Sequence, residues 1–126
     1  MARIVVVDDD PDILNIVCMS LEAVGHEVER AGNGREGVDL VRSNLPDLVL
    51  MDVMMPGMNG YEATAALKAD VSTAPIPVLA LSAKAMRRDE ERGREAGMDA
   101  YITKPFRLSH LLDVVDRFLG QAHRVA

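Results

Sequence analysis

Four apolar runs in the chain each end in a residue suited to metal or phosphate chemistry. Asp8 and Asp9 follow the run 4–7, and Asp52 follows 48–51. Ser82 follows 78–81, and Lys104 follows 100–103. A carboxylate can bind a hard cation or act as a nucleophile, while lysine and hydroxyl groups can hold phosphoryl oxygens. This spacing indicates one site for phosphoryl transfer if the four runs end close together.

Three carboxylates at one point repel one another and raise each other's proton affinity. Asp8, Asp9 and Asp52 therefore suit a site in which a cation neutralises them. The ligand set is all oxygen, with no histidine or cysteine nearby in the sequence, which favours Mg²⁺ that retains several waters. Asp52 could then form an acyl phosphate, with Lys104 and the Ser82 hydroxyl holding the remaining phosphoryl oxygens.

Each of these residues also has an ordinary explanation. Asp52 could cap the turn that follows its strand, and residues 8–10 could be a solvated turn that caps the next helix. A serine or a Lys-Pro pair at the end of one strand is uninformative by itself. The coincidence of all four at successive strand ends favours a shared site.

The elements that must position these residues alternate between strands and helices. Residues 4–7, 48–51, 78–81 and 100–103 predict buried strands, and the weakly alternating 27–31 predicts an exposed or edge strand. Helices are predicted from Pro11 to a stop at Gly25, around 37–41, over 61–67, over the highly charged 86–96, and over the amphipathic 108–119. The pattern predicts an α/β fold, with a five-stranded parallel sheet doubly wound by five helices.

Two helices carry further expectations. In the first helix, apolar residues at helical spacing predict one apolar stripe that faces the core, made by Ile13, Ile16, Val17, Leu21 and Val24. Leu14 and Cys18 border this stripe, and Met19 lies off it. The excess apolar surface is either ordinary packing or a docking face for a partner helix. Cys18, the single cysteine, is expected to be a small apolar helix residue. The charged helix over 86–96 is expected to pack loosely and to shift at low cost.

Composition limits the classes of protein that fit. The 126 residues, 48% hydrophobic and 27% charged, suit one globular domain, ordered over about residues 3–120 with a polar tail at 121–126. The formal charge of −6 disfavours nucleic-acid binding. No apolar run approaches membrane-spanning length and no apolar leader precedes the first strand, so we expect a cytoplasmic protein without membrane association.

Four segments together resemble the response-regulator receiver domain of two-component signalling. They are VVVDDD at 5–10, DLVLMDVMMPGMNG at 47–60, LALSA at 79–83 and AYITKPF at 100–106, and the resemblance extends over essentially the whole chain. It implies a flavodoxin-like receiver fold and a single receiver domain over 1–126. It also implies that the protein takes a phosphoryl group from a sensor histidine kinase or a histidine phosphotransfer protein.

The resemblance implies a role for each matching residue of the acidic site. Asp52 would be the phosphoacceptor. Asp9 and Asp52 would coordinate Mg²⁺ through their carboxylates, Met54 through its backbone carbonyl, and Asp8 mostly through water. Lys104 would pair with the acids or with the phosphoryl oxygen.

The resemblance also implies a switch. The hydroxyl of Ser82, which stands where threonine is frequent, would move toward the phosphoryl group, and Tyr101 would turn inward into the released space. A downstream target would bind the face made by the fourth helix, fifth strand and fifth helix. Met54 and Lys84 occupy positions that tune hydrolysis of the aspartyl phosphate. Because Met54 does little to orient an attacking water, we expect slow or moderate autodephosphorylation.

Alternatives remain open at this point. A Mg²⁺-dependent phosphohydrolase with an aspartyl nucleophile typically needs a second acid where this chain has Met54. A flavin-binding module should cradle phosphate in its first loop, which the acids of residues 8–12 would repel. The chain could also be a receiver fragment of a larger regulator. We expect a signalling module and not an enzyme, as a monomer or a weak homodimer.

Overall fold

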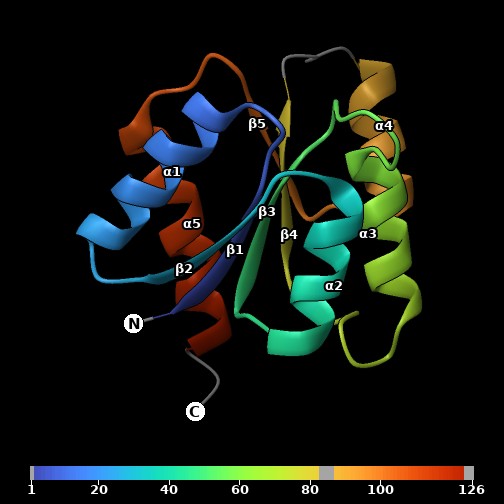
Figure 1. Cartoon of the computed structure of the whole chain (residues 1–126), viewed down its shortest axis with the longest axis horizontal. Helices are drawn as coiled ribbons and strands as arrows, with labels where there is room; N and C mark the ends of the chain where they lie inside the picture. The colour runs from blue at the N-terminus through green and yellow to red at the C-terminus, as the bar shows by residue number, and fades with distance from the viewer. Residues whose placement is uncertain (1, 83–86, 124–126) are drawn as a thin grey trace.

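The computed structural model describes residues 2–82 and 87–123, in which five strands and five helices alternate (Figure 1). The elements are β1 (Arg3–Val7), α1 (Pro11–Ala23), β2 (Glu27–Ala31), α2 (Gly34–Asn44), β3 (Leu48–Asp52), α3 (Gly60–Ala69), β4 (Val78–Ser82), α4 (Arg87–Ala96), β5 (Ala100–Thr103) and α5 (Leu108–His123). Within these residues, no helix combines the length and the apolar character needed to cross a bilayer. Helix α5 continues past residue 120, the predicted end of the ordered core.

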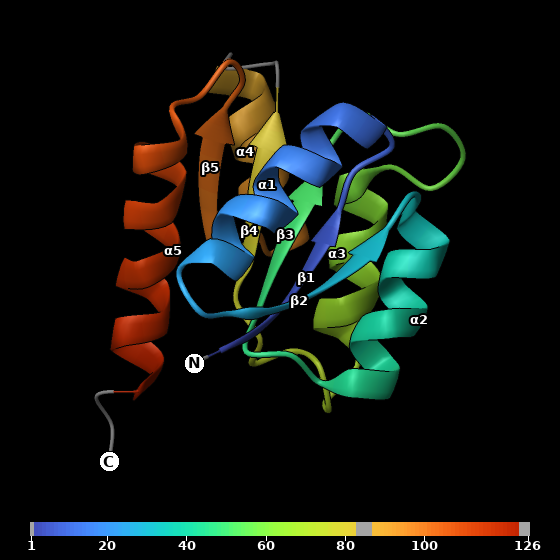
Figure 2. The same ribbon diagram turned by 60° about the vertical axis from the view of Figure 1, so that its left-hand side comes forward.

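All five strands are parallel and pair in the order β2-β1-β3-β4-β5. Parallel neighbours need crossover connections, and the helices supply them. Helices α1 and α5 cover one face of the sheet, while α2, α3 and α4 cover the other (Figures 1 and 2). The predicted doubly wound α/β fold is confirmed, and the segment 27–31 is an edge strand, β2.

Two hydrophobic cores lie on opposite faces of the sheet, and the central strands supply both. In β3, Leu48 and Leu50 pack under α1 and α5, whereas Val49 and Met51 pack under α2 and α3. All four side chains are fully buried. Burial on both faces explains why this strand reads as a continuous apolar run without alternation.

The predicted stripe of α1 is wrong in part. The buried side chains of this helix are Val17, Cys18 and Leu21, while Ile16 is 50% exposed and Val24, beyond the helix end, is 56% exposed. The apolar arc of α1 is wider than the face that the sheet and α5 cover, so spacing alone did not fix the rotation of the helix. Cys18 lies in α1, as predicted, and is fully buried in the core.

A lysine links the segments at the end of the sheet opposite to the predicted site. The Lys68 ammonium donates to the carbonyls of Ala74 at 3.0 Å and Ile76 at 2.7 Å and pairs with Asp99 at 3.3 Å. The Asp99 carboxylate also accepts the Val78 amide at 2.8 Å. One side chain thus ties α3 and the loop before β4 to the start of β5.

Replacing Lys68 by methionine should lower the free energy of unfolding by about 1–3 kcal/mol, because part-buried carbonyls lose a charged donor. Arg42→Met is the matched control, since Arg42 makes a surface ion pair with Asp70 at 3.6 Å and should cost about 0.5 kcal/mol or less. Urea unfolding of both variants measures the difference. Equal losses would contradict a structural role for the Lys68 bonds.

Candidate functional site

The strand register brings two of the predicted acids together. Val7 of β1 pairs with Met51 of β3, so Asp8 and Asp52 follow side by side at the carboxyl ends of neighbouring strands. The sheet order reverses between β1 and β3, and in open α/β sheets ligands bind at such a switch point. This edge of the sheet lies at the top of Figure 1.

Three carboxylates meet at this edge. One oxygen from each of Asp8, Asp9 and Asp52 lies within 4.8 Å of the others. Asp8 is 1% exposed and Asp52 is 3% exposed, whereas Asp9 lies on the surface. Like charges confined at this distance with little water repel one another strongly.

Among the described residues, Lys104 offsets part of this charge. The Lys104 ammonium donates to Asp8 at 3.0 Å and to Asp52 at 3.3 Å. Its backbone amide donates to the Ser82 carbonyl at 2.7 Å, which fixes the loop that carries it. Burial alone would lower the pKa of Lys104, but its hydrogen bond to Asp8 and the charges of both acids raise the pKa, so the lysine stays cationic.

Burial and the crowding of the carboxylates raise the proton affinity of Asp52. Burial, followed by the charge of Asp8, raises the pKa of Asp52 to about 7, and Lys104 reverses only part of this rise. A hydrogen bond with Asp9 also raises it. An all-oxygen set with excess negative charge fits a hard divalent cation, which would relieve the repulsion.

The predicted helix-capping role belongs to Asp10. Its carboxylate accepts the amides of Asp12 at 2.9 Å and Ile13 at 3.4 Å and caps α1. Asp8 accepts the Asp10 amide at 2.9 Å through one oxygen and binds Lys104 through the other. The turn explanation therefore accounts for Asp10 and leaves the acidic cluster unexplained.

The predicted switch residues, Ser82 and Tyr101, lie on the face of the sheet that α2, α3 and α4 cover. Ser82 ends β4, is fully buried, and by strand alternation follows Val78 and Ala80 on the face under α3. Tyr101 pairs with Ala80 in the register and packs, half-buried, against the same core. Lys84 lies outside the described residues.

The loop after Asp52 contains one predicted residue and one that the sequence did not single out. The Met54 side chain is 53% exposed beside the site. Gly60 begins α3, and its amide donates to the Val53 carbonyl at 3.0 Å. A Cβ atom at Gly60 would overlap the carbonyl oxygen of Asp52, so only glycine lets α3 begin this close to the acid.

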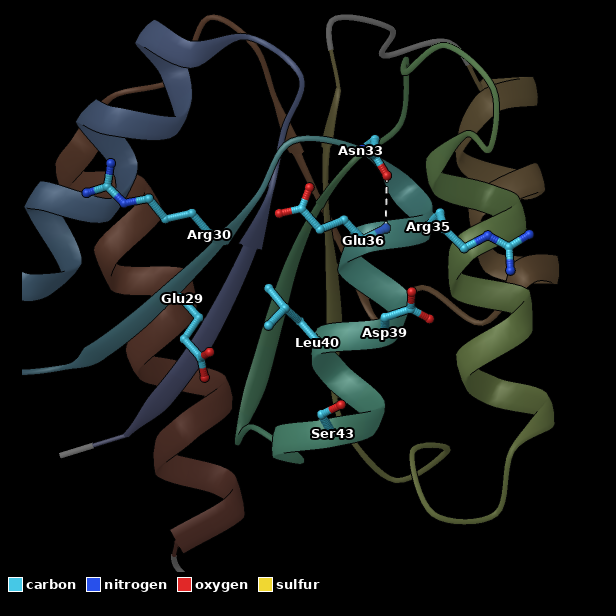
Figure 3. A pocket seen from close by; sticks show the side chains of 8 residues that line it. All are labelled: Glu29, Arg30, Asn33, Arg35, Glu36, Asp39, Leu40 and Ser43. Carbon is cyan, nitrogen blue, oxygen red and sulfur yellow. Dashed lines mark hydrogen bonds between the residues drawn. The ribbon is translucent and has the colours of Figure 1, made fainter.

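A surface hollow of about 630 Å³ lies elsewhere, between β2 and α2. Its lining residues are Glu29, Arg30, Asn33, Arg35, Glu36, Asp39, Leu40 and Ser43. Figure 3 shows acids and arginines pointing in different directions, and the Asn33 side chain accepting the Glu36 amide at 2.8 Å. The groups do not converge, so this hollow is not the candidate site.

Comparisons with known proteins agree with the fold and the acidic edge. The response regulator receiver domain family matches residues 4–116. Protein PilH of Pseudomonas aeruginosa is 42% identical over 120 residues, covering 95% of this chain and 99% of PilH. The structure of the chemotaxis protein CheY4 of Vibrio cholerae matches with a TM-score of 0.90 at 30% identity, covering 94% of this chain and 98% of that chain.

A third relative bears on the metal. The receiver domain of a sensor histidine kinase from Pseudomonas aeruginosa, at 30% identity and a TM-score of 0.88, covers 94% of this chain and 98% of that chain. Its structure holds a magnesium ion coordinated in the active-site cleft.

The fold and the acidic edge define a CheY-like receiver module. The chain belongs to the response-regulator receiver domain family, the phosphoacceptor modules of two-component signalling. The phosphohydrolase alternative is not favoured.

Neutralising Asp52 should stabilise the metal-free protein at alkaline pH. The folded pKa of about 7 exceeds the ordinary 3.8, so ionisation of Asp52 opposes folding, and stability falls as pH rises through 7. Asp52→Asn should therefore unfold later in urea at about pH 8, by on the order of 2–4 kcal/mol, with the difference vanishing near pH 4. A variant less stable than the wild type at about pH 8, with a chelator present, would contradict the crowding.

Proposed function

We propose that Asp52 is the phosphoacceptor and that Asp8, Asp9, Asp52 and the backbone carbonyl of Met54 hold a Mg²⁺ ion beside it. The observation that carries this proposal is the buried Asp52 carboxylate, held by Lys104 next to Asp8 at the switch point of the sheet. Mg²⁺ supplies charge neutralisation for the acids and for a transferring phosphoryl group.

The donor is a phosphohistidine on a sensor histidine kinase or on a histidine phosphotransfer protein. An oxygen of Asp52 attacks phosphorus, the N–P bond breaks, and the imidazole leaves with the bonding electron pair. Lys104 already lies 3.3 Å from Asp52, so its ammonium can transfer from the two carboxylates to the incoming phosphoryl oxygens with a small movement.

The new group carries a charge of about −1.5 to −2 and strong acceptor oxygens. Ser82 and Lys104 gain contacts that exist only in this state, which is the condition for shifting a conformational equilibrium. The Ser82 hydroxyl moves toward the phosphoryl group, and Tyr101 takes an inward position. The face made by α4, β5 and α5 then changes for a downstream target protein.

Acetyl phosphate with Mg²⁺ provides the direct test. We expect the intact mass of the wild-type protein to rise by one phosphoryl group and that of Asp52→Ala to stay unchanged. Asp47→Asn is the control, because Asp47 accepts the Arg3 amide at 2.9 Å at the opposite end of the same strand. Phosphoryl gain by Asp52→Ala would refute the assignment. Steady phosphate release from unrelated monoesters would favour a phosphohydrolase.

The aspartyl phosphate should be hydrolysed slowly or moderately, with Met54 and Lys84 setting the rate. Met54 has a half-exposed apolar side chain that offers an attacking water no hydrogen bond. Met54→Asn should therefore shorten the phosphoryl lifetime by about threefold or more, equivalent to on the order of 1 kcal/mol in the barrier. The decay of the phosphorylated mass after removal of the donor measures the lifetime. Met54→Leu, which stays apolar, should decay as the wild type does, and equal lifetimes for all three proteins would contradict the role of Met54.

A further inference from the structure

The two tyrosines of the chain meet beside the proposed switch. Tyr61, in the first turn of α3, and Tyr101 of β5 place their hydroxyl oxygens 2.7 Å apart. Tyr61 also donates to the backbone carbonyl of Asp89 in α4 at 3.2 Å. A phenol has one proton to donate, and Tyr61 gives its proton to Asp89, so Tyr101 is the donor to Tyr61. The result is a directed chain from β5 through α3 to α4.

Helix α4 rests on both tyrosine rings. The Arg92 guanidinium lies 4.6 Å from the centre of the Tyr61 ring, a cation–π contact. A Cβ atom at Gly93 would come within 2.8 Å of a Tyr101 ring carbon, so glycine here lets the helix lie against that ring. Gly93 is the only buried residue among 89–96. Part of the packing of this polar helix is therefore against the tyrosine pair.

The Tyr61 hydroxyl is suited to hold its partner. Tyr61 is 6% exposed, so little water can replace a lost hydrogen bond at its oxygen. Burial raises the pKa of the Tyr61 phenol, which keeps its proton for the Asp89 carbonyl. If Tyr101 moved outward, the Tyr61 oxygen would lose the hydrogen bond that it accepts from the Tyr101 hydroxyl.

We propose that Tyr61 is a positioning residue of the switch. Its hydroxyl holds Tyr101 inward between α3 and α4, and its bond to Asp89 ties that position to the place of α4. This inference rests on the proposed role of Tyr101. Because the inward position accompanies phosphorylation, a residue that favours it also strengthens binding of a phosphoryl group, by linkage.

Fluorine NMR can observe the two tyrosines directly. Incorporation of 3-fluorotyrosine gives two ¹⁹F resonances, since the chain has two tyrosines, and the shift between H₂O and D₂O measures the solvent exposure of each. Tyr61→Phe keeps the buried ring, removes the hydroxyl and leaves only the Tyr101 resonance. We expect a larger solvent isotope shift for Tyr101 in this variant. We also expect about three- to tenfold weaker binding of beryllofluoride in the presence of Mg²⁺.

Two controls separate positioning from general stability. Arg92→Gln removes the cation over Tyr61 but keeps both hydroxyls, and Val115→Ala weakens the core on the opposite face of the sheet. Both should leave the Tyr101 isotope shift as in the wild type. An increase in Val115→Ala equal to that in Tyr61→Phe would overturn the proposal, because the effect would then follow stability.

The outcomes for the proposal and for the function are distinguishable. Wild-type protein that gains a phosphoryl group on Asp52, together with an unchanged Tyr101 resonance and unchanged beryllofluoride binding in Tyr61→Phe, would overturn the positioning role and leave the proposed function standing. A wild-type protein that gains no phosphoryl group would overturn the function, and with it the link between Tyr61 and phosphorylation.

Discussion

The confinement of Asp52 beside Asp8, with Lys104 as their shared cation, is the constraint on which the rest of the structure depends. The register of β1 and β3 brings the two carboxylates together, and both side chains are almost fully buried from water. Buried charge of one sign is costly unless it is paired, and in the described part of the chain Lys104 pairs with only two of the three clustered acids. The fold thus holds a local imbalance of charge, which a bound cation would relieve.

Strand alternation places the acidic cluster and the predicted switch residues on opposite faces at this edge of the sheet. By strand alternation, the side chains of Asp8 and Asp52 belong to the face of the sheet under α1 and α5. Ser82 and Tyr101 belong to the opposite face, under α2, α3 and α4. The acids and the predicted switch residues are therefore linked through the strand ends and the residues packed beneath them. Gly60 on one side and the tyrosine pair on the other keep these contacts close.

Much of this arrangement could be predicted from the sequence. The continuous apolar runs indicate strands buried on both faces, and their polar ends indicate the acidic edge. The rotation of α1 could not be predicted, because its apolar arc exceeds the face that is covered, and Ile16 lies exposed as a result. The contact of Tyr61 with Tyr101 could not be predicted either. It joins residues 40 positions apart, and a tyrosine in the first turn of a helix gives no sign of its partner.

The most direct test of the central claim is a crystal structure of the protein with Mg²⁺ and beryllofluoride. The predicted result is a metal ion bound by Asp9, Asp52 and the backbone carbonyl of Met54, with Asp8 reaching it mostly through water. The anion should lie on an oxygen of Asp52, with the Lys104 ammonium moved from the carboxylates to the anion. An anion bound away from Asp52, or a Lys104 that still bridges Asp8 and Asp52 beside it, would contradict the claim.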